Sequence, residues 1–173
     1  MDPRTPEQTR KFDEIVVPHI AEAYNLARWI TRSATDAEDV VQESCFRAFK
    51  YIDTYRGGSS RAWLFTIVRN VSYSWLERNR PLALSQPLDE ETEDFSSTES
   101  ETLLQQAIDV VLLKIAVDKL PLQLREVVVL RDMEGLSYKE IAQIEDIPVG
   151  TVMSRIARAR RRLIQLISTP NPS

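Results

Sequence analysis

The chain has 173 residues, of which 43% are hydrophobic and 28% are charged, as is typical of a soluble globular protein with one ordinary domain or two small ones. Cys45 is the only cysteine and His19 the only histidine, which excludes an intrachain disulfide and a Cys/His zinc site. The N-terminal residues lack the apolar core of a signal peptide, and no apolar run is long enough to cross a membrane. We therefore expect a cytoplasmic protein with no direct membrane insertion.

The acidic residues are concentrated in one segment. Residues 85–101 contain seven acids and no Lys or Arg, in a stretch without apolar periodicity, as in an extended linker. Because the whole chain carries −4 and this segment −7, the remainder carries +3, which suits contact with phosphates. Few glycines and abundant helix formers predict an all-α fold. We expect two small helical domains, an N-terminal bundle (10–80) and a C-terminal helix-turn-helix bundle (102–168), joined by a flexible acidic linker (81–101).

The first distinctive helix is expected to begin near Thr35, which forms a capping-box pattern with Glu38. Its predicted core stripe is Val41, Cys45, Ala48, Phe49 and Ile52. A second face carries an aromatic residue among acids at helical spacing: Asp39, Gln42, Glu43 and Phe46. Such a face is typical of a docking surface. A Phe46 that simply covers the neighbouring helix explains the pattern equally well.

The next helix follows the breaker Tyr55-Arg-Gly-Gly and is expected over residues 60–79. Its predicted core stripe is Leu64, Ile67, Val68, Val71 and Trp75. Off this stripe lie aromatic and amide side chains among arginines: Arg61, Trp63, Arg69, Asn70, Tyr73, Arg78 and Arg80. Rings that stack on bases beside guanidinium groups that bind phosphates would suit single-stranded nucleic acid. Aromatic residues used as core, with scattered surface charge, are the simpler alternative from spacing alone.

Two further helices are expected over residues 103–119 and 122–134, separated by Leu120-Pro121. The run from Val127 to Leu130 is also compatible with a buried strand. Its charged flanks and the following Gly135 favour a helix that ends at a glycine cap.

The last third of the chain predicts a helix-turn-helix. Ser137 and Glu140 form a capping box for a short first helix, and Pro148 closes the turn before the second. From Val149 to Ile167 there are five arginines and no acid. The predicted buried stripe is Val152, Ile156, Ala159 and Leu163, with Ser154, Arg155, Arg158 and Arg162 on the solvent side. A lone basic helix would be an ordinary solvated face, but the capped helix and turn before it favour a helix that enters the DNA major groove.

These motifs together resemble one family, the extracytoplasmic-function group of bacterial sigma-70-type sigma factors. The resemblance is carried by Asp36-Ala-Glu-Asp-Val-Val-Gln-Glu-Ser-Cys-Phe-Arg-Ala-Phe, Tyr55-Arg-Gly, Trp63-Leu-Phe-Thr-Ile-Val-Arg-Asn70, Leu120-Pro, Glu134-Gly-Leu-Ser-Tyr-Lys-Glu-Ile-Ala and Val149-Gly-Thr-Val. They occur in the family's order and spacing and cover about residues 12–166.

The resemblance implies partners and sites. The partners are core RNA polymerase, through the clamp helices of its largest subunit and its β flap, promoter DNA in double- and single-stranded form, and an anti-sigma factor. Polymerase docking would use Asp39, Gln42, Glu43 and Phe46. Recognition and melting of the −10 element would use Tyr55, Arg61, Trp63, Arg69, Asn70 and Tyr73. Recognition of the −35 element would use Thr151, Met153, Ser154, Arg155, Arg158, Arg161 and Arg162, although Met153 stands where the family usually has Lys or Arg.

Two other functions compete with a sigma factor. A helix-turn-helix regulator that binds duplex operators without polymerase would explain the C-terminal segment, but it would need neither the Phe46 face nor the helix of aromatics and arginines. An enzyme would need a nucleophile–base pair, a metal cluster or a phosphate-binding glycine loop, and the sequence has none of these patterns. We therefore expect no catalytic residues, no metal ligands and no cofactor, and a structural role for His19.

Overall fold

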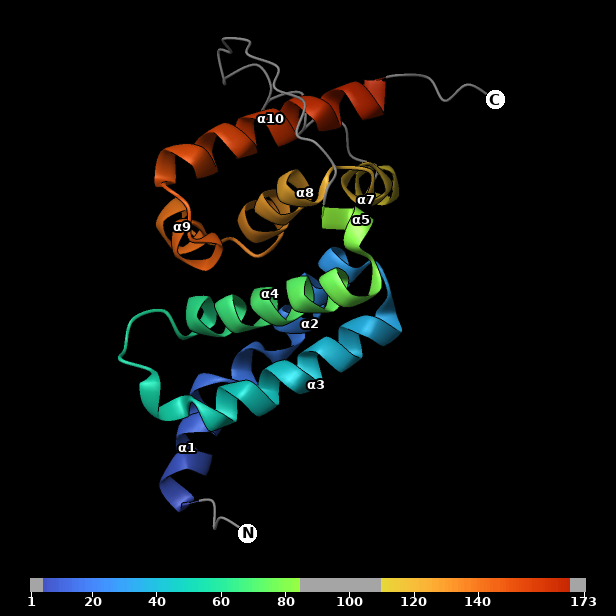
Figure 1. The fold of residues 1–173 in the computed structure, drawn as a ribbon. Coiled ribbons are helices and arrows are strands. Elements are labelled where there is room, and N and C mark those ends of the chain that lie inside the picture. Colours follow the sequence, from blue (N-terminus) through green and yellow to red (C-terminus); the bar gives the residue numbers. More distant parts are fainter. Residues whose placement is uncertain (1–4, 85–109, 169–173) are drawn as a thin grey trace.

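The computed structural model describes residues 5–84 and 110–168, and all the regular elements in these two ranges are helices (Figure 1). The predicted acidic segment 85–101 and the first part of the helix expected from residue 103 lie outside the described residues. We call residues 5–84 the N-terminal bundle and residues 110–168 the C-terminal bundle. The all-α fold expected from the sequence is confirmed.

The N-terminal bundle is built around α2, α3 and α4, which pack against one another. Its elements are α1 (Pro6–Ile15), η1 (Val17–His19), α2 (Ile20–Thr31), α3 (Ala34–Lys50), η2 (Ile52–Thr54), α4 (Ser60–Asn79) and α5 (Pro81–Leu84). The largest fully buried side chains of this bundle include Leu26, Ile30, Leu64, Phe65 and Leu76. Burial of such side chains contributes roughly 1.5–3 kcal/mol each.

Helix α3 begins earlier than its sequence indicated. The N-cap is Ser33, whose hydroxyl accepts a hydrogen bond from the backbone N–H of Asp36, so the predicted start at Thr35 was wrong. The buried stripe is also displaced, since Val40 and Ser44 are buried whereas the predicted Val41 and Cys45 are only partly buried. Ser44 can be buried because its hydroxyl donates to the carbonyl of Val40 at 2.7 Å. A buried hydroxyl without a hydrogen-bond partner would lower the stability of the fold.

Helix α4 runs over Ser60–Asn79, as predicted, and Ser59 caps it. It is buried on a wider arc than one stripe, because the C-terminal bundle packs against it as well as α2 and α3. The buried residues are Ala62, Leu64, Phe65, Val68, Val71, Ser72 and Leu76. The predicted core residues Ile67 and Trp75 are only partly buried.

The C-terminal bundle consists of α7 (Val110–Asp118), α8 (Leu122–Val128), η3 (Val129–Met133), α9 (Tyr138–Glu145) and α10 (Val149–Ser168). The run from Val127 to Leu130 is helical and buried, which confirms a helix over the alternative strand. Its last turn, η3, is a π-helix in which the N–H of Glu134 donates to the carbonyl of Val129 at 2.9 Å. Gly135 follows with φ of +70°, as expected of a residue that ends a helix.

The helix-turn-helix has the predicted local structure. Ser137 and Glu140 make both hydrogen bonds of the capping box at the start of α9. Asp146, in the left-handed conformation, ends α9 before Pro148 leads into α10. The four predicted core residues of α10, Val152, Ile156, Ala159 and Leu163, are all buried. Outside the turn, Arg131 donates to the carbonyl of Leu136 at 2.9 Å and lies over the ring of Tyr138, fixing the approach to α9.

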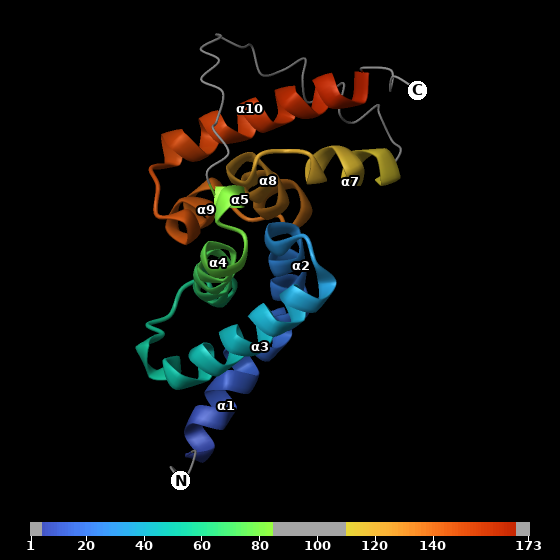
Figure 2. The ribbon, with the colours of Figure 1, turned by 45° about the vertical axis from the view of Figure 1, so that its right-hand side comes forward.

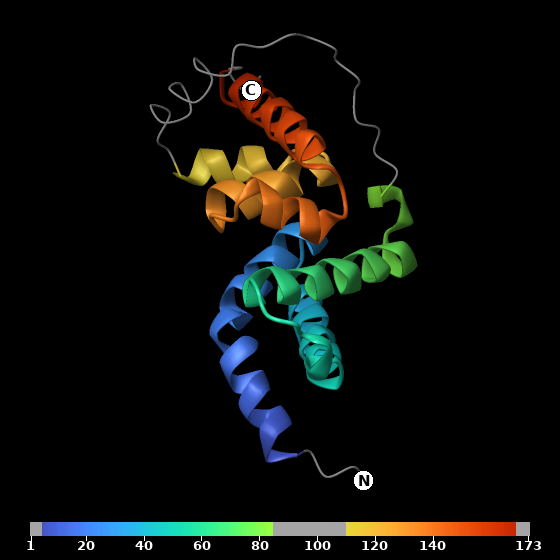
Figure 3. The same ribbon diagram turned by 90° about the vertical axis from the view of Figure 1, so that its left-hand side faces the viewer.

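The two bundles lie against each other, with α1 and α10 at opposite ends of the molecule (Figures 1 and 2). Helix α9 packs on α4, and α8 packs on α2 (Figure 3). Arg125 of α8 is buried in this contact and donates to the carbonyls of Leu120 in its own bundle, at 3.1 Å, and Ile30 in the other, at 3.5 Å. Burial and the charge of neighbouring Arg32 together lower the pKa of Arg125 to about 10, so the guanidinium still carries its charge at neutral pH.

Candidate polymerase-binding and nucleic-acid interfaces

The face of α3 predicted to dock on a partner is exposed. Asp39, Gln42 and Glu43 are all exposed, and Phe46 is 65% exposed. Glu43 is held by Arg47 one turn further on, at 2.9 Å. An exposed aromatic ring among acids favours the docking surface over the alternative in which Phe46 packs within the bundle.

A groove between α2 and α3 borders this face. It has a volume of about 710 Å³ and is lined on the α3 side by Glu38, Asp39, Val41 and Gln42, and on the α2 side by Ile20, Ala21, Tyr24 and Asn25. Its lining combines apolar and acidic side chains, and it shares Asp39 and Gln42 with the Phe46 face, which it therefore extends toward α2. The arrangement suits a partner helix that is basic and partly apolar.

The start of α4 brings part of the predicted −10 group together. The rings of Tyr55 and Trp63 meet edge to face with centroids 5.6 Å apart. Tyr55 donates to the carbonyl of Gly58 at 2.7 Å, across a loop in which Gly57 and Gly58 have φ of +95° and +83°. Residues other than glycine rarely adopt these angles. The glycines therefore let the loop fold back so that the two rings share one surface.

Other members of the group face the C-terminal bundle instead of solvent. Arg61 donates to the carbonyl of Glu134 at 2.9 Å, and Arg69 forms an ion pair with Glu126 of α8. Tyr73 donates to the same carboxylate of Glu126 at 2.6 Å. An open basic face was one of the two interpretations of the sequence, and the structure differs from it because α9 packs on α4 and Glu126 of α8 reaches Arg69 and Tyr73. Asn70, by contrast, is exposed.

The predicted −35 residues are spread over the exposed and half-buried sides of α10. Met153, Ser154 and Arg162 are exposed, whereas Thr151, Arg158 and Arg161 are half-buried. Arg155 differs from its expected solvent position: its side chain is 18% exposed and pairs with the fully buried carboxylate of Glu145 at 3.7 Å. Of the exposed members, Met153 and Ser154 lie in the N-terminal part of α10, where helix-turn-helix proteins contact base edges, and Arg162 lies in its C-terminal half.

Sequence analysis missed two buried acids, Glu126 and Glu145. Burial raises the pKa of Glu126, although Arg69 opposes this effect. Burial and the charge of Glu126 raise the pKa of Glu145 to about 8. Burial also raises the pKa of the Tyr73 hydroxyl, and Glu126 adds to this rise, so Tyr73 remains a hydrogen-bond donor. The only signal in the sequence was the charged pair Arg125–Glu126 within an otherwise apolar run, since buried acids are rare unless they are paired.

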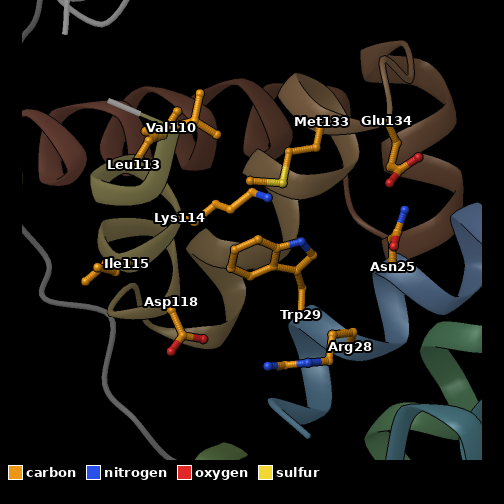
Figure 4. A pocket seen from close by; sticks show the side chains of 10 residues that line it. All are labelled: Asn25, Arg28, Trp29, Val110, Leu113, Lys114, Ile115, Asp118, Met133 and Glu134. Atoms are coloured by element: carbon orange, nitrogen blue, oxygen red, sulfur yellow. The ribbon is translucent and has the colours of Figure 1, made fainter. Parts of the chain in front are cut away.

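A second groove lies where α2 meets α7 and η3, with a volume of about 750 Å³ (Figure 4). Figure 4 shows Trp29 of α2 beside Met133 and Lys114, so both bundles contribute to the walls. Along its rim the apolar side chains of Val110 and Ile115 are 56% and 47% exposed. Exposed apolar side chains beside a groove are typical of a protein-binding surface.

Within residues 5–84 and 110–168, no group of His, Cys, Asp and Glu side chains is arranged to hold a metal ion. His19 bonds to the hydroxyl of Ser60 at 3.1 Å, a contact that joins η1 to the start of α4. A search of the same residues finds no helix with the length and apolar character needed to span a membrane.

The fold and surfaces define a class: an all-helical protein whose helix-turn-helix bundle is coupled to a second bundle with an exposed acidic-aromatic face. Comparison with known proteins is consistent with this class. The chain matches the family model for sigma-70 region 2 over residues 15–81 and that for sigma-70 region 4 over residues 112–163.

Among curated relatives, the ECF RNA polymerase sigma factor SigE of Mycolicibacterium smegmatis is 33% identical over 153 residues, which cover 88% of this chain and 60% of that protein. The ECF RNA polymerase sigma-E factor of Salmonella typhimurium is 36% identical over 138 residues, covering 74% of this chain and 72% of that one. The protein therefore belongs to the ECF family of RNA polymerase sigma factors.

Solved structures agree. The sigma factor RpoE from Bartonella quintana, crystallised with the anti-sigma factor NepR, superposes with a TM-score of 0.69 and 28% identity, covering 92% of this chain and 98% of that one. CnrH, solved in complex with the cytosolic domain of CnrY, superposes with a TM-score of 0.64 and 28% identity. The superposition covers 92% of this chain and 88% of the CnrH chain.

Proposed function

We propose that this protein binds core RNA polymerase, directs it to specific promoters and promotes opening of the DNA strands at the start of transcription. The family supports the general activity. The single observation of this chain that favours it over a duplex-binding regulator is the exposed Phe46 among the acids of α3. A regulator that acts without polymerase has no use for this second protein-binding face.

The proposed division of labour follows the two bundles. Residues 10–80 would dock on polymerase and recognise the −10 element, residues 102–168 would recognise the −35 element, and residues 81–101 would link them. The protein would contribute binding and orientation and no catalytic step, because the polymerase carries out the chemistry. Polymerase and promoter DNA are both found in the bacterial cytoplasm, so we propose that the protein acts there.

Asn70 is our candidate for strand opening. Its amide can donate to and accept from a base edge, and it is exposed on α4 beside the Arg69–Tyr73 pair. A base that leaves the helical stack loses a few kcal/mol of stacking and pairing, which a binding pocket must return. Exposure of the amide supports this role over one confined to bonds within the bundle.

We also propose an anti-sigma factor as a partner, since RpoE from Bartonella quintana was solved with the anti-sigma factor NepR. The groove between α2 and α7 is the candidate contact site (Figure 4). A ligand there would touch both bundles at once. It could therefore restrain their separation.

Run-off transcription tests the proposed function. Purified core polymerase, a set of promoter fragments and the full chain are combined, and each component is omitted in turn. We expect a discrete transcript that requires both the chain and the core enzyme. Equal transcription without the chain, or DNA protection by the chain alone with no effect of core polymerase, would support the duplex-binding regulator instead.

A further inference from the structure

The contact between the bundles buries side chains that the proposed function assigns to DNA. Both carboxylate oxygens of Glu126 are occupied, one by the Arg69 guanidinium and the other by the Tyr73 hydroxyl at 2.6 Å. The Arg69 side chain is 18% exposed and that of Glu126 is 1% exposed. Arg69 also lies over the Tyr73 ring, 4.2 Å from its centroid. The two α4 residues therefore bind one acid of the C-terminal bundle as a unit.

A second acid extends this cluster to the recognition helix. The carboxylate of Glu145, at the end of α9, lies 3.7 Å from the Arg155 guanidinium of α10. The charges of Glu126 and Arg69 also act on Glu145, and that of Arg155 acts on Glu126. Two acids of the C-terminal bundle thus contact arginines predicted to bind the −10 and −35 elements: Glu126 contacts Arg69 across the two bundles, and Glu145 contacts Arg155 within its own bundle. All four charges lie where α4, α8, α9 and α10 converge.

The chemistry of this cluster is that of phosphate binding. A guanidinium and a hydroxyl bind a carboxylate with the same N–H and O–H groups that bind a phosphate oxygen. Because Arg69 and Tyr73 each direct a donor into the carboxylate of Glu126, those donors are unavailable to a DNA strand. Contact between the bundles and contact with DNA therefore compete for the same groups.

We propose that Glu126 forms a carboxylate latch, which holds the predicted DNA-binding side chains Arg69 and Tyr73 of the N-terminal bundle in contact with α8 and so masks them in the free chain. The latch rests on the proposed function, because that function assigns these side chains to DNA. Promoter binding then requires the bundles to separate. A partner that binds the separated state more tightly would unmask Arg69 and Tyr73 together.

Other links between the bundles are weaker candidates for control. Arg32 and Asp118 form an ion pair at 3.0 Å, but both side chains are largely exposed, and exposed pairs contribute little. Removal of one partner from a buried pair is far more damaging, since it leaves a charge without compensation. Substitution of Glu126 should therefore disturb the contact between the bundles more than substitution at the exposed pair. Arg32 supplies a matched control, because it also takes part in an ion pair between the bundles.

The test uses the full chain with E126A, E126Q and R32Q. Small-angle X-ray scattering measures the radius of gyration, and fluorescence anisotropy measures binding of a short fluorescein-labelled single-stranded oligonucleotide of mixed sequence. We expect E126A to expand the free chain and to tighten oligonucleotide binding about tenfold, since apparent affinity rises with the fraction of competent molecules. E126Q keeps the side-chain size without the charge and should show a smaller change in the same direction. R32Q should match the wild type in both measurements.

Circular dichroism establishes that each variant retains its helices. If E126A loses helicity, E126Q decides the question by the same two measurements. A folded Glu126 variant with unchanged scattering, or one that expands without tighter binding, would overturn the latch. Run-off transcription by the wild-type chain tests the proposed function separately. An inactive wild type would refute the function, whereas an active wild type with unresponsive Glu126 variants would refute the latch alone.

Discussion

Glu145 should make the stability of the fold depend on pH. Its carboxylate is buried at the end of α9, and burial together with Glu126 raises its pKa from the ordinary 4.5 to about 8. The folded protein therefore holds a proton on Glu145 that the unfolded chain has released above pH 4.5. It follows that stability is unaffected by this group at low pH and falls as pH rises between about 4.5 and 8.

The size of the effect follows from the same shift. Each pH unit in that window removes up to roughly 1 kcal/mol from the free energy of unfolding. Arg155, which pairs with Glu145 at 3.7 Å, favours the ionised form and so limits how far the pKa of Glu145 rises. The Glu145→Gln variant has no carboxyl to titrate, so its unfolding free energy should vary less with pH. Glu126 remains in that variant, and burial raises its pKa in the same direction, so some dependence persists.

Urea unfolding followed by circular dichroism at half-unit intervals from pH 5 to about pH 8.5 gives the free energy of unfolding against pH for the wild type and for Glu145→Gln. Glu14→Gln, a change at an exposed acid of α1, is the matched control and should keep the wild-type slope. Glu145 would be excluded as the source if the Glu145→Gln curve ran parallel to the wild type across this range. A wild-type free energy of unfolding that rises with pH across this range would contradict the raised pKa of Glu145.

Three further predictions concern the proposed interfaces. Replacement of Asp39 and Glu43 by Lys should abolish co-purification with core polymerase while helicity is retained, because like charges at an interface cost several kcal/mol. Asp13→Lys on α1 is the control. Retained co-purification of the double variant would reject this face as the docking surface. Arg158→Ala should weaken binding to a −35 duplex by about 1–3 kcal/mol if the side chain contacts guanine, and an equal loss on scrambled duplex would indicate a phosphate contact instead. Asn70→Ala should slow promoter opening in permanganate footprinting without lowering the melting temperature, and a stable variant that opens DNA at the wild-type rate would remove Asn70 from the site.

The sequence predicted local structure best where capping and periodicity act within one helix. The bounds of α4 and the core stripe of α10 needed only near neighbours in the chain: Ser59 caps α4, and Val152, Ile156, Ala159 and Leu163 recur at helical spacing. The start of α3 was less certain because two hydroxyl residues compete for the cap. Ser33 is the observed cap, and its bond to the N–H of Asp36 fixes the start of the helix two residues before the predicted cap.

The orientation of the bundles could not be predicted from either bundle alone. Arg69 and Tyr73 have the composition of an exposed nucleic-acid surface, and only the packing of α8 on the N-terminal bundle turns them into partners of Glu126. Long-range pairs such as this leave no trace in periodicity. Arg155 was misplaced for a related reason, since its acid lies on a different helix. The sequence left open whether Phe46 is exposed or covers a neighbouring helix, and the structure favours the exposed alternative for Asp39 and Phe46.

Several arginines at the contact between the bundles bind main-chain carbonyls. Arg125 reaches the carbonyl of Ile30, and Arg61 reaches that of Glu134. A carbonyl is present whatever side chain its residue carries. Substitutions should therefore remove these hydrogen bonds when they are made at the donor residues and not when they are made at the acceptor residues. Substitutions at the two donors should lower stability, whereas those at Ile30 and Glu134 should act only through their own side chains. The acceptor side can therefore change in sequence while the hydrogen bonds that cross the contact are retained.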